Sequence, residues 1–200
     1  MRNIKYLIIS VLFNAFGTAM MANSELGLSA WGAGATNIAN YYSLSLGAAF
    51  NIIAVLSYIV AIIILRRFNL KEAVMSFVFA FSFGFFVDLF MYMLPDFGLS
   101  SLLIRVIVNI VGLSVMSFGI AVHLRINLAV HPMDVYLGAV QKAFKSIAIG
   151  TYFVYGTVFI VALIYGYLYG DIQGIGIGTI NTILFAGLIL KYYDKVLKYI

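Results

Sequence analysis

The sequence places a histidine, a proline and an aspartate within four residues, between two long apolar runs. In the stretch HPMDVYLGAVQKAF these residues are His131, Pro132 and Asp134. Imidazole and carboxyl groups exchange protons, so the stretch is a candidate for handling a solute or a proton. Pro is favoured at the first position of a helix and an acidic residue in its first turn. The motif therefore predicts a short helix over about Met133–Phe144, with Lys142 near its C-terminal end.

Two roles are open for this short helix. It is either an elbow at the interface that links two spans, or a segment that dips into the membrane with its free N–H groups facing a solute. Asp134 is correspondingly a helix-start residue or a proton carrier. His131 and His123 are either pH-sensitive groups or ordinary histidines at the level of the lipid headgroups.

Other polar side chains fall inside apolar runs, where an unpaired polar group costs free energy. Asp88 and Arg105 lie near matching ends of consecutive runs, so we predict that they pair or at least face the bundle interior. Amides within the runs are read as interhelical contacts or as solute contacts. The candidates for a substrate pathway are Trp31, Asn14, Asn109, His131, Pro132, Asp134 and Asn181.

Small residues predict where helices approach each other closely. The candidates for such packing are Gly32, Gly34, Gly174, Gly176 and Gly178. The stretch GIGIG is only superficially similar to a phosphate loop, because no Lys-Ser or Lys-Thr follows it and no strand precedes it.

The residues of several chemistries are missing from the sequence. The chain has no cysteine, which excludes disulfides, thiolate metal sites and a cysteine nucleophile. It has two histidines, no His-Glu-x-x-His motif and no Gly-x-Ser-Gly around a buried serine. We therefore expect no enzymatic activity, no catalytic residue, no metal and no cofactor.

The composition is that of an integral membrane protein. Of its 200 residues, 64% are hydrophobic and 10% charged, with a mean hydropathy of +1.08, whereas about 25% of a soluble domain is charged. The partner is thus the lipid bilayer. The net charge of +5 does not indicate nucleic-acid binding, because basic residues of membrane proteins gather in cytoplasmic loops.

Six apolar runs are long enough to span a bilayer as helices, which needs about 20 residues each. They are Ile4–Ala22, Leu46–Leu65, Glu72–Leu94, Leu99–Val122, Ile147–Tyr169 and Gly174–Leu190. Apart from Arg105, the basic residues lie only before or at the start of the first run, in the connections after the second and fourth, and in the tail. This alternation predicts a multi-pass protein of the plasma membrane with both termini in the cytoplasm.

An internal repeat divides the chain into two halves, residues 1–98 and 99–200, within one membrane domain. The stretch FGTA at Phe16 recurs as FGIA at Phe118, an offset of 102, and at that offset SAWGA falls on HPMDV. Each half then contains three spans and one short non-spanning helix, the first of them Trp31–Tyr42. Because three is odd, the halves have opposite orientations, as in many secondary transporters. The expected fold is an all-α membrane protein with six transmembrane helices in two inverted repeats.

The stretches HPMDVYLGAVQKAFKSIAIGT and GIGIGTINTILFAGLIL resemble the YczE/YyaS/YitT family of bacterial integral membrane proteins. In that family a Pro-Trp-Asp-Val element opens a short helix and a Gly-rich, Gly-Thr-x-x-Asn-like element opens the last span. The matching residues are Pro132, Asp134, Val135, Gly176, Gly178, Thr179 and, slightly displaced, Asn181. Met133 replaces the Trp, which the first half keeps as Trp31. The family largely lacks assigned substrates, and small-molecule export is suggested for some relatives.

The expected function is a small-molecule secondary transporter, in either direction and working alone or as a homodimer, with an unidentified solute. Two alternatives are kept. One is a membrane substrate-binding subunit of an energy-coupling uptake system, which needs small residues on the first span such as Ala15 and Gly17. The other is a scaffold or regulator that does not transport.

Overall fold

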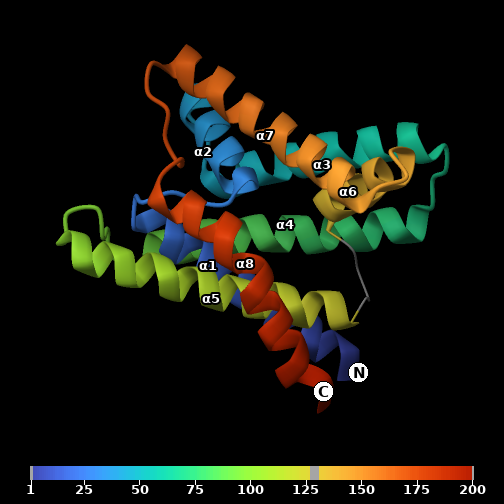
Figure 1. Cartoon of the computed structure of the whole chain (residues 1–200), viewed down its shortest axis with the longest axis horizontal. Helices are drawn as coiled ribbons and strands as arrows, with labels where there is room; N and C mark the ends of the chain where they lie inside the picture. Colours follow the sequence, from blue (N-terminus) through green and yellow to red (C-terminus); the bar gives the residue numbers. More distant parts are fainter. Residues whose placement is uncertain (1, 127–130, 200) are drawn as a thin grey trace.

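The computed structural model describes residues 2–126 and 131–199, and these residues form α-helices joined by short connections (Figure 1). Val130, which precedes the His-Pro motif, lies outside this part. The helices are α1 (Arg2–Asn23), α2 (Ala30–Tyr42), α3 (Leu46–Leu65), α4 (Leu70–Met93), α5 (Leu102–Ile126), α6 (Pro132–Ala143), α7 (Ile147–Tyr169) and α8 (Ile177–Val196), followed by a 3₁₀ turn, Leu197–Tyr199. The expected all-helical fold class is confirmed.

Side-chain caps set the start of several helices. Ser29, Ser45 and Ser146 precede α2, α3 and α7, and each hydroxyl accepts a hydrogen bond from a backbone N–H of the first turn. Such a cap satisfies a donor that the helix itself leaves free. The expected spans Leu46–Leu65 and Ile147–Tyr169 therefore coincide with α3 and α7 at both ends.

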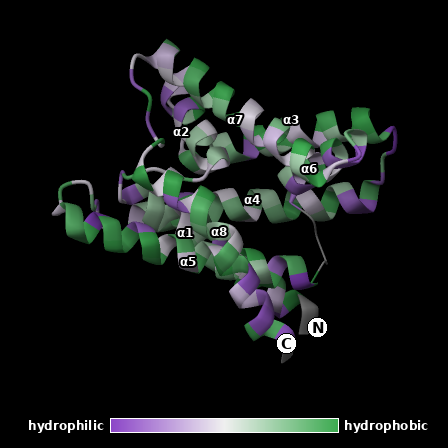
Figure 2. Ribbon diagram, in the orientation of Figure 1, coloured by the Kyte–Doolittle hydropathy of each residue, from purple (hydrophilic) through white to green (hydrophobic). Residues whose placement is uncertain are grey.

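Five helices, α1, α3, α4, α5 and α7, are long and apolar enough to cross a membrane. Hydrophobic residues cover most of their length in Figure 2, and many of their large apolar side chains are exposed, as lipid contact requires. The sixth expected span, Gly174–Leu190, corresponds to α8, which begins later and includes the polar residues Lys191 and Asp194. These residues and Asn181 lower its mean hydropathy.

Both termini lie at one end of the bundle, together with the α3–α4 and α6–α7 connections (Figure 1). We call this the basic end, because Arg66, Arg67 and Lys145 lie in its connections and Lys71 lies in the first turn of α4. The α1–α2, α4–α5 and α7–α8 connections lie at the opposite end, which we call the acidic end after Glu25, Asp96 and Asp171. The separation of charge between connections is that expected from the sequence.

Helix α1 packs against both α5 and α4, and the two short helices are enclosed by the longer ones. Helix α2 packs against α7 and α3, and α6 packs against α3, α7 and α4. The main partner of α8 among the helices is α5. Two helices that follow each other in the sequence, α4 and α5, are thus bridged by α1.

Glycines allow α1 and α5 to touch backbone to backbone. A Cβ atom on Gly17 would lie 2.8 Å from Cα of Met116, and one on Gly119 would lie 2.9 Å from Cα of Asn14. No side chain fits into either space, so both positions require glycine. The same holds where α3 crosses α4, because a Cβ on Gly84 would lie 2.7 Å from the carbonyl oxygen of Gly47.

We predict that Gly17→Ala and Gly119→Ala each lower the thermal stability of the purified protein, by an amount typical of overpacking, about 1–3 kcal/mol. The matched control is Gly156→Ala in α7, where an added Cβ meets nothing within 4 Å. Alanine favours a helix over glycine, so the control should unfold at the same or a higher temperature. Thermal unfolding monitored by size-exclusion chromatography measures this. Equal losses in all three variants would contradict the close α1–α5 contact.

Candidate functional site

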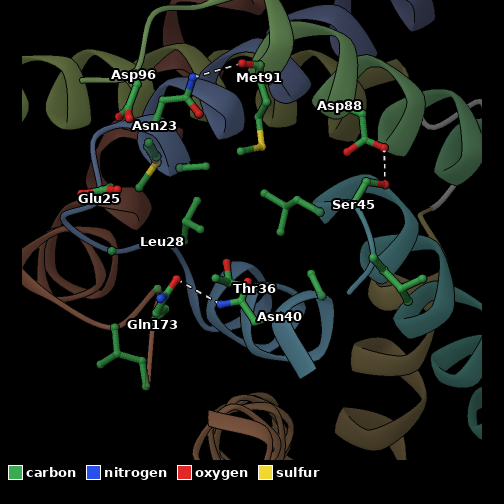
Figure 3. A pocket seen from close by; sticks show the side chains of 18 of the residues that line it. Asn23, Glu25, Leu28, Thr36, Asn40, Ser45, Asp88, Met91, Asp96 and Gln173 are labelled. Atoms are coloured by element: carbon green, nitrogen blue, oxygen red, sulfur yellow. Dashed lines mark hydrogen bonds between the residues drawn. The ribbon is translucent and has the colours of Figure 1, made fainter. Parts of the chain in front are cut away.

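A cavity of about 810 Å³ opens at the acidic end of the bundle (Figure 3). Its wall is formed by the α1–α2 connection, α2, the start of α3, the end of α4 and Ile172–Ile175 of the α7–α8 connection. Both halves of the chain therefore contribute to it. The volume is within the range of small-molecule sites.

The charged side chains of the cavity wall are all acidic. Glu25, Asp88 and Asp96 line it, and its described lining includes no lysine or arginine. Amide side chains add hydrogen-bonding groups, among them Asn40, which donates to Gln173 Oε1 at 3.0 Å (Figure 3). A wall of this composition attracts cationic or neutral polar solutes and repels anions.

Asp88 is held against the start of α3. Its carboxylate accepts hydrogen bonds from Ser45 Oγ at 2.6 Å and from the backbone N–H of Gly47 at 2.7 Å. A carboxylate is stabilised at the N-terminal end of a helix, where free N–H groups and the helix dipole favour negative charge. Asp88 thus fastens α4 to α3 and also presents charge to the cavity.

The expected ion pair between Asp88 and Arg105 is wrong. Arg105 donates instead to the backbone carbonyls of Ser24, at 2.8 Å, and Glu25, at 3.0 Å, and lies 3.6 Å from the Glu25 carboxylate. The physical reason is the position of α1, which bridges α4 and α5 and brings its own C-terminal connection within reach of Arg105. Similar depth in consecutive spans does not imply contact.

Two buried amides fix the connections that border the cavity. Asn109, which is 1% exposed, donates to Ser24 Oγ and to the carbonyl of Gly27, both at 3.0 Å. Asn37, which is fully buried, donates to the carbonyl of Gln173 at 2.7 Å and accepts from its N–H at 3.1 Å. Both are interhelical contacts that satisfy backbone groups within the membrane protein.

The α1–α2 and α7–α8 connections are also joined directly through their backbones. The N–H of Leu28 donates to the carbonyl of Gly174 at 2.9 Å, and that of Gly178 donates to Leu26 at 2.7 Å. Gly174 has φ of 72°, a conformation that glycine adopts without strain. At Gly176 a Cβ would lie 2.5 Å from the carbonyl oxygen of Leu26. Close approach of two irregular segments therefore accounts for the glycine-rich stretch.

Gly32 and Gly34 lie on the buried face of α2. A Cβ on Gly34 would lie 3.0 Å from Val158 Cγ1, near the middle of α7. Gly34 thus allows α2 to lie close against α7, whereas a Cβ on Gly32 would meet the side chain of Leu28 in the preceding connection. Within the residues that the structure describes, no group of three or more His, Asp or Glu side chains is arranged to hold a metal ion.

A second polar cluster surrounds the first turn of α6. His131 caps this helix: its Nδ1 accepts from the N–H of Met133 at 3.3 Å, and Pro132 occupies the first turn. The ring lies edge-on to Phe79 and Phe83, with centroids 5.5 and 5.8 Å away. Burial, together with the nearby His123, lowers the pKa of His131 to about 3. His131 is therefore neutral, as an accepting Nδ1 requires.

Trp31 connects the two short helices, because its ring lies 6.5 Å from that of Tyr136 in α6. The structure thus places Trp31 against α6, the helix whose start carries His131, Pro132 and Asp134. The other two amide candidates, Asn14 and Asn181, are half-buried on α1 and α8, and their side chains make no hydrogen bond to another described residue.

Apart from Asp88 and Gly174, the residues of the cavity wall were not singled out from the sequence. Glu25, Asp96 and Gln173 stood out only as the polar content of connections that lack basic residues. Their convergence depends on the pairing of connections that are about 150 residues apart in the chain, and no local pattern reveals such pairing.

Comparison with known proteins gives a relative and a family without an assigned function. It is 26% identical, over 196 residues, to the uncharacterized protein YyaS of Bacillus subtilis (strain 168), a match that covers 96% of this chain and 92% of that protein. No solved structure matches the chain. The expected resemblance to YyaS-type proteins is confirmed, and, since the model of a family of unknown function, DUF6198, matches residues 1–195, the chain belongs to that family.

Proposed function

We propose that the protein is a secondary transporter of small cationic or polar solutes, with both termini in the cytoplasm of a bacterial cell and the cavity open to the outside. The main observation in support of this proposal is a cavity with an acidic wall, to which both halves of the chain contribute. The helices of the two halves also pack in matching pairs. Alternating access would come from movement of residues 1–98 relative to residues 99–200.

The helix pairs support an inverted repeat. Suppose that each helix of the first half is exchanged with its counterpart in the second half, α1 with α5, α2 with α6, α3 with α7 and α4 with α8. The contact of α2 with α7 then becomes that of α6 with α3, the contact of α1 with α4 becomes that of α5 with α8, and the contact of α2 with α3 becomes that of α6 with α7. All of these contacts are present in the structure. The exchange also holds at the level of residues. Gly17 faces Met116 and Gly119 faces Asn14, and both steps, from 17 to 119 and from 14 to 116, equal the sequence offset of 102. A pseudo-two-fold relation between the halves explains this coincidence.

The same offset relates the caps of the short helices, Ser29 of α2 and His131 of α6. Two packed pairs, α3–α4 and α4–α6, depart from the relation. Helices α3 and α4 touch at Gly47 and Gly84. The counterpart of Gly84 is Gly187, at an offset of 103 because the second half has one inserted residue, and a Cβ on Gly187 would meet nothing within 4 Å. Alternating access requires two halves of similar structure that are packed differently. The inward-open and outward-open conformations interconvert when the two halves exchange their packing arrangements.

The two alternatives fit the structure less well. A substrate-binding subunit of an energy-coupling system would use small residues on α1 to dock its partner, but Ala15 is fully buried and Gly17 faces α5. A scaffold would need no cavity between the halves. The acidic wall favours transport over both.

We predict that purified protein in proteoliposomes transports ethidium, a representative organic cation, when an ion gradient is imposed in one direction or the other. It should not transport benzoate. Asp88→Asn and Asp96→Asn should each lower ethidium flux about 5- to 10-fold, because each removes one charge from the wall, worth about 1 kcal/mol or somewhat more. The matched control is Asp194→Asn, which removes an exposed carboxylate paired with Arg125 at the other end of the bundle.

Ethidium flux that is unaffected by both cavity variants would reject this cavity as the entry site. Protein that moves neither ethidium nor a polyamine such as spermidine, under gradients of protons and of sodium, would overturn the transport proposal. Binding of the same cations without flux would favour a binding subunit instead.

We predict that single cysteines replacing Lys71 and Lys142 are both labelled by a membrane-impermeant maleimide only after the cytoplasmic face is opened. Cysteines replacing Asp96 and Asp171 should be labelled in intact cells. The chain has no native cysteine, so unmodified protein is the blank. The reason is the alternation of basic and acidic connections. Labelling of Lys71→Cys and Lys142→Cys from opposite faces would refute the inverted arrangement.

A further inference from the structure

We propose that Asp134 and His123 form a proton-binding site at the start of α6, in which the Asp134 carboxyl reversibly takes up the proton. Where the proposed transport function holds, this proton is the coupling ion, and that extension rests on the proposed function. The proton site itself depends only on the geometry around α6.

His123 is aimed at Asp134 from the neighbouring helix α5. Its Nε2 lies 3.9 Å from Asp134 Oδ2, and its side chain is buried. Its Nδ1 is buried and has no hydrogen-bond partner in the part of the chain that the structure describes. The ring packs on Phe79 with centroids 4.4 Å apart. Its ionisable neighbours are the neutral His131 and the Asp134 carboxyl, and of these two the carboxyl is the group with which it can share a proton.

Asp134 differs from the other six acidic residues of the chain. Each of those makes a hydrogen bond or an ion pair that stabilises its negative charge: Glu25 with Arg105, Glu72 with Arg67 and Asn69, Asp88 with Ser45 and Gly47, Asp96 with Gly98, Asp171 with Gln173, and Asp194 with Arg125. The Asp134 carboxylate accepts no hydrogen bond from any described residue, and its distance to His123 exceeds hydrogen-bond length. Its charge is therefore the least compensated of the seven.

The other groups around Asp134 do not neutralise it. His131, at the cap of the same helix, is neutral, and Tyr155 of α7 and Tyr136 of α6 carry no charge at neutral pH. Helix α3 contributes only Tyr58, which packs on Phe77, and the charged residues of α4 lie at its ends. Residues 127–130, Asn-Leu-Ala-Val, contain no ionisable side chain.

Two opposing effects act on the carboxyl. The N-terminal end of α6 favours the ionised form, because the helix dipole is positive there. The surrounding protein disfavours the ionised form. Although 46% of the Asp134 side chain is exposed at the surface of the chain, desolvation by the neighbouring helices raises the pKa of Asp134 to about 6. The group therefore ionises at neutral pH and protonates in mild acid, within the range that a cellular proton gradient covers.

The depth of the site suits coupling. The cap of α6, His131, meets α4 at Phe79 and Phe83, which are near the middle of Leu70–Met93. Tyr136, further along α6, meets Trp31 at the start of α2. Asp134 thus lies between the two ends of the bundle, where both short helices begin. A proton passes from a hydronium ion to the carboxylate oxygen, giving a neutral carboxyl whose O–H can donate to His123 Nε2, and it leaves to water on the other face.

The direct test is infrared difference spectroscopy of the protein in lipid nanodiscs, titrated from about pH 8 to about pH 4.5. We expect a protonated-carboxyl band that rises with a midpoint near pH 6, is absent in Asp134→Asn and is unchanged in Asp194→Asn. Asp134→Glu should retain a titrating band. His123→Ala admits water beside the carboxyl, so the midpoint should fall by about one unit towards that of a free aspartate.

A band that persists in Asp134→Asn, or a wild-type midpoint near the ordinary value of about 4, would overturn the proton site. Coupling is tested separately with ethidium in proteoliposomes. Asp134→Asn should keep ethidium exchange but lose accumulation driven by a pH gradient, and unchanged accumulation would overturn the coupling. If the wild type moves no ethidium at all, the transport proposal fails, while the infrared result still decides the proton site.

Discussion

Direct contact between the backbones of α1 and α5 is the constraint on which the arrangement depends. In lipid, apolar side chains gain little by leaving the solvent, so helices associate through close packing and polar contacts. Gly17 and Gly119 permit such packing at one crossing, and each faces the other helix without an intervening side chain. The remaining helices are arranged around this crossing, with α4 on one side and α8 on the other.

The second requirement is that no backbone group within the bundle is left without a partner. The connections at the acidic end are irregular, and they meet this requirement by pairing with each other and with Asn37, Asn109 and Arg105. This explains why polar residues that would be costly in lipid occur in the spans. The same irregular segments form the cavity wall, so structure and the proposed solute site share one set of residues.

Much of the fold follows from local rules. Serine caps and apolar runs determine α3 and α7, the His-Pro motif determines the start of α6, and the alternation of basic connections determines which ends lie together. What could not be predicted is which helices touch. Asp88 and Arg105 have matching depths but different neighbours, because depth is encoded in each run whereas lateral position is encoded in packing between distant runs. The proton site was only partly visible: Asp134 was recognised from the motif, but its proximity to His123 depends on where α5 ends.

The packing of α2 has a consequence for biosynthesis. Most of the contact surface of α2 is supplied by α7, and the amide of Asn37 finds its partner in Gln173, which is made 136 residues later. During translation the first four helices therefore emerge with a short helix that bears polar groups and lacks its main packing partner, although α3 is present. The first half can therefore complete its folding in the membrane only after the ribosome has synthesised the second half.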